Sequence, residues 1–293
     1  MLINKPKDIT SFGVVAKIKW LLHEKRVGHT GTLDPMATGV LPVFVGRATA
    51  LSSLLLEADK VYTATFRFGI TTDTADITGK ILSEKPVNIK SKDILSALKQ
   101  FTGNITQVPP MYSAIKKNGV PLYKLARLGE TVEVPKREVT INYIEPKSDF
   151  KNNEITVQVS CSKGTYIRSL CADIGEYLGC GATLSSLRRD ETSGFTLAHC
   201  VNLEDLTNEN INNYIIDEEK AVEHLREIKI SDKQAVRFCN GGQLSFERLN
   251  YEFKTDYELL RVKSGEKLLG IGVADIEKEQ VAIKCILRGI ADE

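Results

Sequence analysis

The most informative run in this chain reads Gly28-His29-Thr30-Gly31-Thr32-Leu33-Asp34-Pro35-Met36-Ala37-Thr38-Gly39. It places the carboxylate of Asp34 directly before a proline and among glycines that permit tight turns, so Asp34 belongs to a loop rather than to a helix interior. An isolated Asp-Pro pair usually forms a turn in which the aspartate bonds its own backbone. The flanking His29, threonines and glycines shift the interpretation towards a functional loop, and Asp34 becomes the first candidate for chemistry.

The size and composition are those of an ordinary soluble globular protein of one or two domains, with 293 residues, 42% of them hydrophobic and 26% charged. No apolar run has the length of a membrane span, and the first residues lack the apolar core of a signal peptide, so we expect a cytoplasmic protein. The six cysteines show no Cys-x-x-Cys spacing, which favours free thiols over a zinc site or a disulfide framework.

The net charge of +1 hides an uneven distribution. From Lys116 to Arg137 six cations stand against two acids, whereas from Val201 to Leu225 seven acids stand against one lysine. The basic segment lies within residues 107–137. This range is interrupted by prolines and glycines and also contains aromatic residues, Tyr112 and Tyr123. Two ordinary solvated faces would explain the charges equally well, but cations beside rings also suit RNA, with phosphates bound by the cations and bases stacked on the rings.

The apolar pattern predicts a mixed α/β domain followed by a small all-β domain of short strands from about residue 228. We expect a helix over 11–22 capped by Ser11, strands over 41–45 and 62–68, a helix from Ser91, a hairpin over 139–161, a helix after Thr165 and a strand over 184–189. Residues 107–137 should form an irregular excursion with one helical turn near 123–128. No phosphate-binding loop, dinucleotide fingerprint or cluster of metal ligands accompanies these elements.

Arg168 is the second unusual residue, because it falls in the first turn of its predicted helix, where a cation opposes the helix dipole. It is either a tolerated surface arginine or the partner of a fixed anion, which would be Asp34 or a phosphate. Pairing would keep Asp34 ionised, and an ionised, partly desolvated carboxylate can act as a nucleophile. By default, Tyr62 is a core tyrosine at the start of a strand and Leu187 is an apolar core residue. His29 could be a base, a hydrogen-bonding group or a stacking ring.

At this point the chain resembles the TruB family of tRNA pseudouridine synthases. The Asp34 loop is similar to the signature of that family, and together with further matching motifs it covers about the first two-thirds of the chain, in the order of the family. They are Lys5-Pro6 with Thr10-Ser11, Asp59-Lys60-Val61-Tyr62, Pro110-Met111-Tyr112-Ser113-Ala114-Ile115-Lys116, Cys161-Ser162-Lys163-Gly164-Thr165-Tyr166-Ile167-Arg168 and Leu187-Arg188-Arg189.

The resemblance implies an isomerase that converts uridine 55 in the T-loop of tRNA to pseudouridine on a flipped-out base, without cofactor or metal. It implies that Asp34 is the nucleophile, attacking base or sugar, that Tyr62 stacks on the target base and is a candidate to take its proton, and that Arg168 pairs with Asp34. It further implies that Tyr166 and Leu187 line the base pocket and that His29 wedges into the T-loop. With the basic excursion it gives Lys116 and Lys117 as RNA-binding residues.

The resemblance also implies an α+β fold. We expect a catalytic domain over 1–227, built on a mixed, mainly antiparallel sheet with flanking helices, which carries an RNA-binding insertion at about 107–137. A small all-β PUA-like domain should cover 228–293. The expected partner is the T-arm of tRNA, bound by a monomer with no obligatory protein partner and no membrane.

Two positions depart from the family pattern. Asp8 stands where glycine is usual, which places the conformation of that turn in question, and Ala50 stands where lysine is usual, which removes one expected contact. Two other functions remain as alternatives: a tRNA-folding chaperone that needs no chemistry, and a guide-RNA-dependent pseudouridine synthase that needs protein partners. The basic excursion argues for a stand-alone enzyme, because such an enzyme must hold its own RNA.

Overall fold

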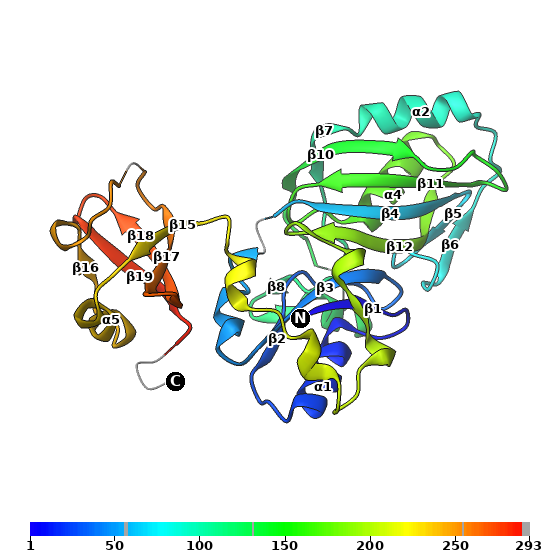
Figure 1. The fold of residues 1–293 in the computed structure, drawn as a ribbon. Helices are drawn as coiled ribbons and strands as arrows, with labels where there is room; N and C mark the ends of the chain where they lie inside the picture. The colour runs from blue at the N-terminus through cyan, green and yellow to red at the C-terminus, as the bar shows by residue number, and fades with distance from the viewer. Residues whose placement is uncertain (56–57, 131, 254, 289–293) are drawn as a thin grey trace.

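The computed structural model describes residues 1–55, 58–130, 132–253 and 255–288, and it contains two separate large sheets (Figure 1). The first has ten strands, ordered β14-β1-β3-β12-β4-β11-β10-β7, with β2 on β3 and β13 on β12. Its strands are β1 (Leu2–Lys5), β2 (Val27–His29), β3 (Thr38–Val45), β4 (Lys60–Phe68), β7 (Gly103–Gln107), β10 (Arg137–Pro146), β11 (Glu154–Cys161), β12 (Ala182–Thr192), β13 (Phe195–Thr196) and β14 (Val201–Asn202).

The ten-stranded sheet is mixed and mainly antiparallel, as expected, with parallel pairs only between β1 and β14 and between β3 and β12 among the described strands. Strand β4 shows why these residues form a strand, since its buried and half-buried residues alternate without interruption. Helices α2 (Ser91–Gln100) and α4 (Ile167–Tyr177) place their apolar residues in one core with those of β4, β10, β11 and β12. The predicted hairpin over 139–161 is confirmed as the pair β10 and β11.

Helix α1 (Ser11–Leu22) confirms the predicted bounds, and it packs in a second core with β1 and β3 through Val14, Val15 and Ile18. The predicted cap was wrong. Thr10 is the N-cap and accepts from the backbone N–H of Gly13, whereas Ser11 lies inside the helix and is buried. Thr10 takes the position because its backbone is extended while that of Ser11 is already helical.

The predicted excursion contains a small hairpin and one short helix, which are β8 (Lys116–Lys117), β9 (Val120–Pro121) and α3 (Leu122–Arg127). Another hairpin outside the main sheet consists of β5 (Ile70–Thr72) and β6 (Ile81–Glu84). The remaining short turns of 3-10 helix are η1 (Gly46–Leu51), η3 (Leu197–His199), η4 (Leu203–Asp205), η5 (Ile211–Tyr214), η6 (Glu218–Ala221) and η7 (Phe246–Arg248).

The second sheet lies apart from the first in Figure 1 and has the order β15-β17-β18-β19-β16. Its strands are β15 (Arg226–Lys229), β16 (Leu244–Ser245), β17 (Leu259–Ser264), β18 (Lys267–Asp275) and β19 (Gln280–Ile286). The expectation of short strands only after residue 228 was incomplete, because α5 (Asp232–Cys239) also forms there, with a capping box between Ser231 and Gln234. None of the helices in the described ranges is long and apolar enough to cross a membrane.

Candidate active site

The loop that carries Asp34 joins β2 to β3 and lies where the two halves of the large sheet meet. Strand β3 pairs with β12 at only two positions, Thr38 with Arg188 and Gly39 with Arg189, directly after this loop. Gly39 has φ +106°, and a Cβ there would lie 2.2 Å from the carbonyl oxygen of Arg189, so the close approach of the two strands requires glycine. Gly39, which follows the loop, thus lets β3 lie against β12 and fixes the end of the loop there.

The N-terminal segment fixes the backbone on both sides of Asp34. The hydroxyl of Ser11 accepts from the N–H of Leu33 at 2.9 Å and donates to the carbonyl of Leu33 at 3.1 Å. On the other side, the carbonyl of Pro35 accepts from the backbone N–H of Asp8 at 2.8 Å and from Lys5 Nζ at 3.2 Å. The residues before and after the carboxylate are therefore tied to one neighbouring segment, which pre-organises the loop.

Lys5 is fully buried, and its ammonium group is surrounded by carbonyl oxygens. Besides Pro35, it donates to the carbonyls of Pro6 at 2.8 Å and Ile9 at 2.7 Å. Burial lowers the pKa of Lys5 to about 8, and the nearby carboxylates of Asp34 and Asp8 oppose that fall. Lys5 therefore adds positive charge near Asp34, and its hydrogen bonds link the N-terminal segment to the loop at Pro35.

Asp34 and Arg168 form a two-point ion pair. Arg168 Nε lies 2.8 Å from Oδ2 of Asp34, and Nη2 donates to Oδ1 at 3.1 Å. Arg168 sits in the first turn of α4 with its side chain 3% exposed, and its guanidinium also donates to the carbonyls of Thr74 at 2.9 Å and Tyr112 at 2.7 Å. Of the two anions expected for Arg168, the structure brings it to Asp34, in a geometry that orients the carboxylate as well as attracting it.

Asp76 is a second carboxylate at this site, and our reading of the sequence missed it. It is buried, and its Oδ2 lies 3.9 Å from Nη1 of Arg168. Its Oδ1 accepts from the hydroxyls of Thr74 at 2.9 Å and Thr78 at 2.6 Å and from the N–H of Thr78 at 3.0 Å. The run of threonines and aspartates over 71–79 has no place among the residues predicted from the sequence. Its density of short polar side chains was the signal available for a buried polar network.

Opposing effects set the pKa of Asp34. Burial raises it, the charge and hydrogen bond of Arg168 lower it, Asp76 raises it further and Lys5 lowers it. The net result is a carboxyl pKa above its ordinary value, in a group whose side chain is still 32% exposed. Asp34 is therefore both desolvated and accessible, as a nucleophilic carboxylate must be.

A cleft of about 290 Å³ opens above the ion pair. It brings together five of the predicted site residues, which are Asp34, Tyr62, Tyr166, Arg168 and Leu187. Tyr62 and Leu187 are nearly buried, with side chains from the adjacent strands β4 and β12. Tyr166 precedes α4, and the side-chain amide of Gln107 binds its N–H at 3.0 Å and its carbonyl at 3.3 Å. The aromatic and apolar side chains beside the ion pair suit a flat, neutral base, and the cleft is also lined by Lys60 and Arg189.

The other predicted residues lie outside this cleft. His29 ends β2, half-buried, and its Nδ1 has no hydrogen-bond partner; burial and the charge of Arg189 lower its pKa. Lys116 and Lys117 are exposed on β8. Lys117 reaches the carbonyl of Glu133 at 3.0 Å, which ties the hairpin to the far end of the excursion. None of the three lines the cleft, and they remain predicted RNA contacts.

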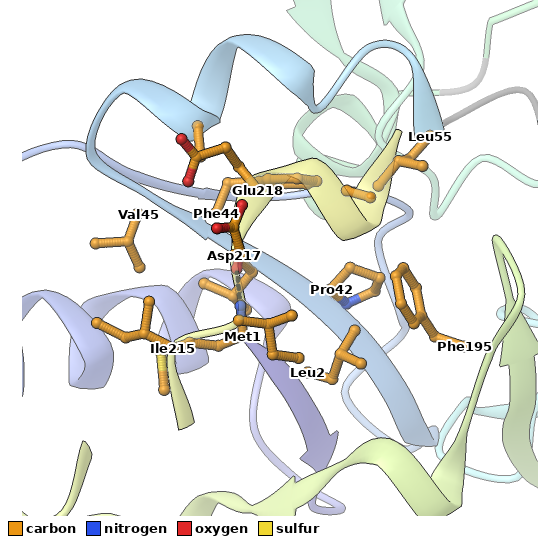
Figure 2. Close-up of a pocket in the computed structure, with 14 residues that line it drawn as sticks. Met1, Leu2, Pro42, Phe44, Val45, Leu55, Phe195, Ile215, Asp217 and Glu218 are labelled. Atoms are coloured by element: carbon orange, nitrogen blue, oxygen red, sulfur yellow. Dashed lines mark hydrogen bonds between the residues drawn. The ribbon is translucent and has the colours of Figure 1, made fainter. Parts of the chain in front are cut away.

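A second pocket lies away from Asp34 and is lined mainly by apolar side chains of β1, β3 and residues 215–221 (Figure 2). Its two carboxylates are already used, because Asp217 accepts from the N–H of Glu219 and Glu218 pairs with Arg288 at 3.3 Å. It is a packing seam between the large sheet and the chain leading to the small one. Over the described ranges, no three His, Cys, Asp or Glu side chains gather in a way that could hold a metal ion.

Comparison with known proteins agrees with this geometry. Residues 19–167 match the model of the TruB family pseudouridylate synthase N-terminal domain, and residues 168–229 match that of the tRNA pseudouridylate synthase B C-terminal domain. The chain is 46% identical over 275 residues to tRNA pseudouridine synthase B of Clostridium kluyveri. The matched residues cover 92% of this chain and 93% of the relative. The chain belongs to the TruB family.

Other TruB-family and structural relatives extend the comparison. The protein of the same name from Chromobacterium violaceum is 46% identical over 253 residues, covering 85% of this chain and 82% of its own. Among solved structures, a chain of a Cbf5-Nop10-Gar1 complex matches with a TM-score of 0.75 and 28% identity over 98% of this chain and 85% of that one. A chain of an H/ACA RNP bound to a substrate RNA containing 2'-deoxyuridine matches with a TM-score of 0.71 and 26% identity, covering 99% and 86%.

The two departures from the TruB pattern have different outcomes. Asp8 adopts φ +65°, the left-handed conformation that glycine would take there, and its N–H still reaches Pro35, so the turn is present without glycine. Ala50 lies exposed on η1 at a surface hollow that is also lined by Arg26 and Arg47. The alanine itself offers no cation, and the positive groups at that surface are the two arginines.

Proposed function

We propose that this chain isomerises uridine 55 in the T-loop of tRNA to pseudouridine, with Asp34 as the nucleophile. The observation that carries the proposal is the two-point Asp34–Arg168 pair at the base of a cleft with apolar and aromatic walls. The names of the TruB relatives give the reaction class, and this pair is the group in the cleft equipped for it. An anchored arginine keeps the carboxylate oriented, and the cleft shields it from most of the solvent.

The chemistry needs only groups that this chain supplies. Attack by Asp34, on base or sugar, bonds its carboxylate to the target nucleoside, and the bond between N1 and C1' breaks. The uracil turns and C5 forms the new bond to C1'. The bond to Asp34 breaks, which restores the carboxylate, the proton leaves C5 and N1 gains one, so the product is an isomer of the substrate. Tyr62 is placed to stack on the base and is the candidate acceptor for the C5 proton, while Tyr166 and Leu187 hold the ring. We therefore propose a reaction without cofactor or metal.

The RNA must be opened before this chemistry begins, because the target base is stacked within a folded loop. Extrusion costs a few kcal/mol, which contacts to phosphates offset. We propose that His29 fills the space that the base leaves, and that Lys116 and Lys117 bind the phosphate backbone from the exposed β8 hairpin. The predicted insertion over 107–137 would then grip the RNA without help from another protein.

The same reasoning leads us to propose a two-domain cytoplasmic monomer with no obligatory partner. The catalytic domain would cover 1–227 and the PUA-like domain 228–293. Strand β15 already pairs with β17 at Arg226, so the second sheet begins two residues before that boundary. Ion pairs from η6 to the second sheet, such as Lys263 with Glu219 at 3.0 Å, support a defined rather than a loose attachment.

One experiment tests the function directly. The purified protein is incubated with an unmodified T-arm stem-loop RNA, and pseudouridine is measured at position 55. We expect conversion without guide RNA or added protein, and none by Asp34→Asn, which should still bind the RNA. Conversion only with a guide RNA and partner proteins would identify the guide-dependent alternative. Full complementation of a deletion strain by Asp34→Asn would favour the chaperone alternative.

A further inference from the structure

Arg189 is a buried cation of the cleft to which the reaction as proposed above gives no role. It lies on β12 directly opposite Tyr62 of β4 in the antiparallel register. Opposed residues of such a pair project from the same face of the sheet with Cβ atoms about 5 Å apart. Both side chains line the cleft above Asp34. The register therefore puts a guanidinium group beside the tyrosine that is expected to contact the target base.

The surroundings of Arg189 leave part of its guanidinium unsatisfied. The residue is 1% exposed, Nε donates to the carbonyl of Val40 at 2.8 Å, and Nη2 has no hydrogen-bond partner. Nη1 lies 2.9 Å from the point that a Cβ on Gly31 would occupy, so the catalytic loop packs directly on this group. In the described part of the chain no carboxylate forms an ion pair with Arg189, and an unpaired buried cation is costly to folding.

The charged and titratable groups that act on Tyr62 come from three directions. Burial raises the pKa of its hydroxyl, Arg189 from β12 lowers it by charge and by hydrogen bonding, and Cys161 from β11 and Asp34 from the loop raise it. Arg189 is thus the one of these groups that favours the phenolate. A guanidinium can only donate hydrogen bonds, so the oxygen of Tyr62 is the acceptor in any bond between the two side chains.

We propose that Arg189 is a positioning residue of the reaction, whose guanidinium donates to the hydroxyl oxygen of Tyr62 and holds that oxygen at a fixed place beside the target base. The inference rests on the proposed function. It assigns Arg189 an action through Tyr62 rather than on Asp34, whose ion pair is made by Arg168. The role requires a donor-only group of fixed charge, held rigidly under the loop, and the bond to Val40 supplies that rigidity.

The neighbouring residue offers a matched control. Arg188 is the same residue type on the same strand, but its side chain is 52% exposed and pairs with Asp190 at 2.6 Å. Because successive side chains of a strand point to opposite faces, Arg188 projects away from the cleft that Arg189 lines. Replacing it removes an equal charge from β12 and leaves Tyr62 untouched.

The test combines kinetics with a titration of Tyr62. Single-turnover rates and RNA affinity are measured for Arg189→Met, Arg189→Lys, Tyr62→Phe, the double variant of Arg189→Met with Tyr62→Phe, and Arg188→Met. We expect Arg189→Met to lower the rate constant by about tenfold or more with RNA affinity nearly unchanged, Arg189→Lys to restore part of it, and Arg188→Met to match the wild type. In the Tyr62→Phe background, Arg189→Met should cause little further loss. Equal losses in both backgrounds would overturn the proposal.

The pKa of Tyr62 gives a readout that does not depend on catalysis. Tyrosine ring carbons are labelled, and the Tyr62 signal is assigned by its loss in Tyr62→Phe. We expect its pKa to rise in Arg189→Met and to rise less in Arg189→Lys. An unchanged pKa would refute the Arg189–Tyr62 interaction. If Arg189→Met does not fold, the comparison rests on Arg189→Lys. If the wild type makes no pseudouridine, the proposed function fails while this titration still decides the interaction.

Discussion

Ser11 binds both backbone polar groups of Leu33 through a single hydroxyl, at 2.9 Å from the N–H and 3.1 Å from the carbonyl oxygen. Leu33 is the residue before Asp34, so one side chain at the start of α1 fixes the approach of the chain to the proposed nucleophile. Both partners are buried, which means that water cannot replace the hydroxyl if it is removed.

This relationship predicts that Ser11→Ala reduces catalysis more than RNA binding. The change leaves two buried backbone groups of Leu33 unsatisfied, at about 1–3 kcal/mol each, and loosens the loop that carries Asp34. The single-turnover rate and the RNA affinity separate the two effects. Thr10→Ala is the control, because it removes the N-cap of the same helix, at about 1 kcal/mol, without touching the loop. Equal rate losses in both variants would show that only helix stability is involved.

Asp76 should be required for full activity although it does not contact Asp34. In Asp76→Asn the oxygen that binds Thr78 is kept, while the negative charge opposite Arg168 is removed. Arg168 then loses one of its anchors, and we expect the single-turnover rate to fall by about tenfold, which corresponds to about 1.4 kcal/mol of transition-state stabilisation. Asp73→Asn serves as control, since the side chain of Asp73 in the same turn binds the N–H of Lys80 instead. A wild-type rate in Asp76→Asn would exclude this role.

The pH dependence should reflect the raised pKa of Asp34. Its carboxyl group must be ionised to attack, and burial raises its pKa above the ordinary value of 3.8, so activity should be lost as the pH falls through a value above 3.8. Rates are measured at RNA concentrations that saturate at each pH. Asp173 on α4 also has a raised pKa, of about 6, because it is buried and near Glu176. Asp173→Asn should therefore leave the loss of activity at low pH unchanged. If this variant shifts that loss to another pH, Asp173 and not Asp34 is the group that titrates.

The β8 hairpin should contribute to RNA affinity mainly through its charge. Replacing Lys116 and Lys117 with glutamine removes two exposed cations and should reduce the slope of log affinity against log salt by about 1.5, with little change in the rate at saturating RNA. Lys92 and Lys99, exposed on α2, form a matched pair of the same charge. If both double variants change the slope equally, the hairpin has no special place in the interface.

Much of the fold could be predicted from local patterns. The alternation along 62–68, the helix over 11–22 and the hairpin over 139–161 follow from residue periodicity, and these elements are present as β4, α1 and the pair of β10 and β11. The loop around Asp34 was recognisable because Gly31 and Pro35 disfavour regular structure there, whereas Gly28 and Gly39 of the same run lie in β2 and β3. The helix α5 was missed because its apolar residues are few in a segment dominated by strand-like runs.

The sequence by itself determined that Asp34 and Arg168 are unusual, because an aspartate in this turn and an arginine in a first helical turn are local properties, and the motif around Tyr62 singled out that residue through the family resemblance. Only the tertiary structure decided how they meet. Arg168 reaches Asp34 across 134 positions, Asp76 supports it from a separate turn, and Arg189 faces Tyr62 through strand register. Periodicity reveals the face on which a side chain lies, but not which strand lies beside it or in what register. Those are set by the packing of the whole sheet, and with them the arrangement of the site.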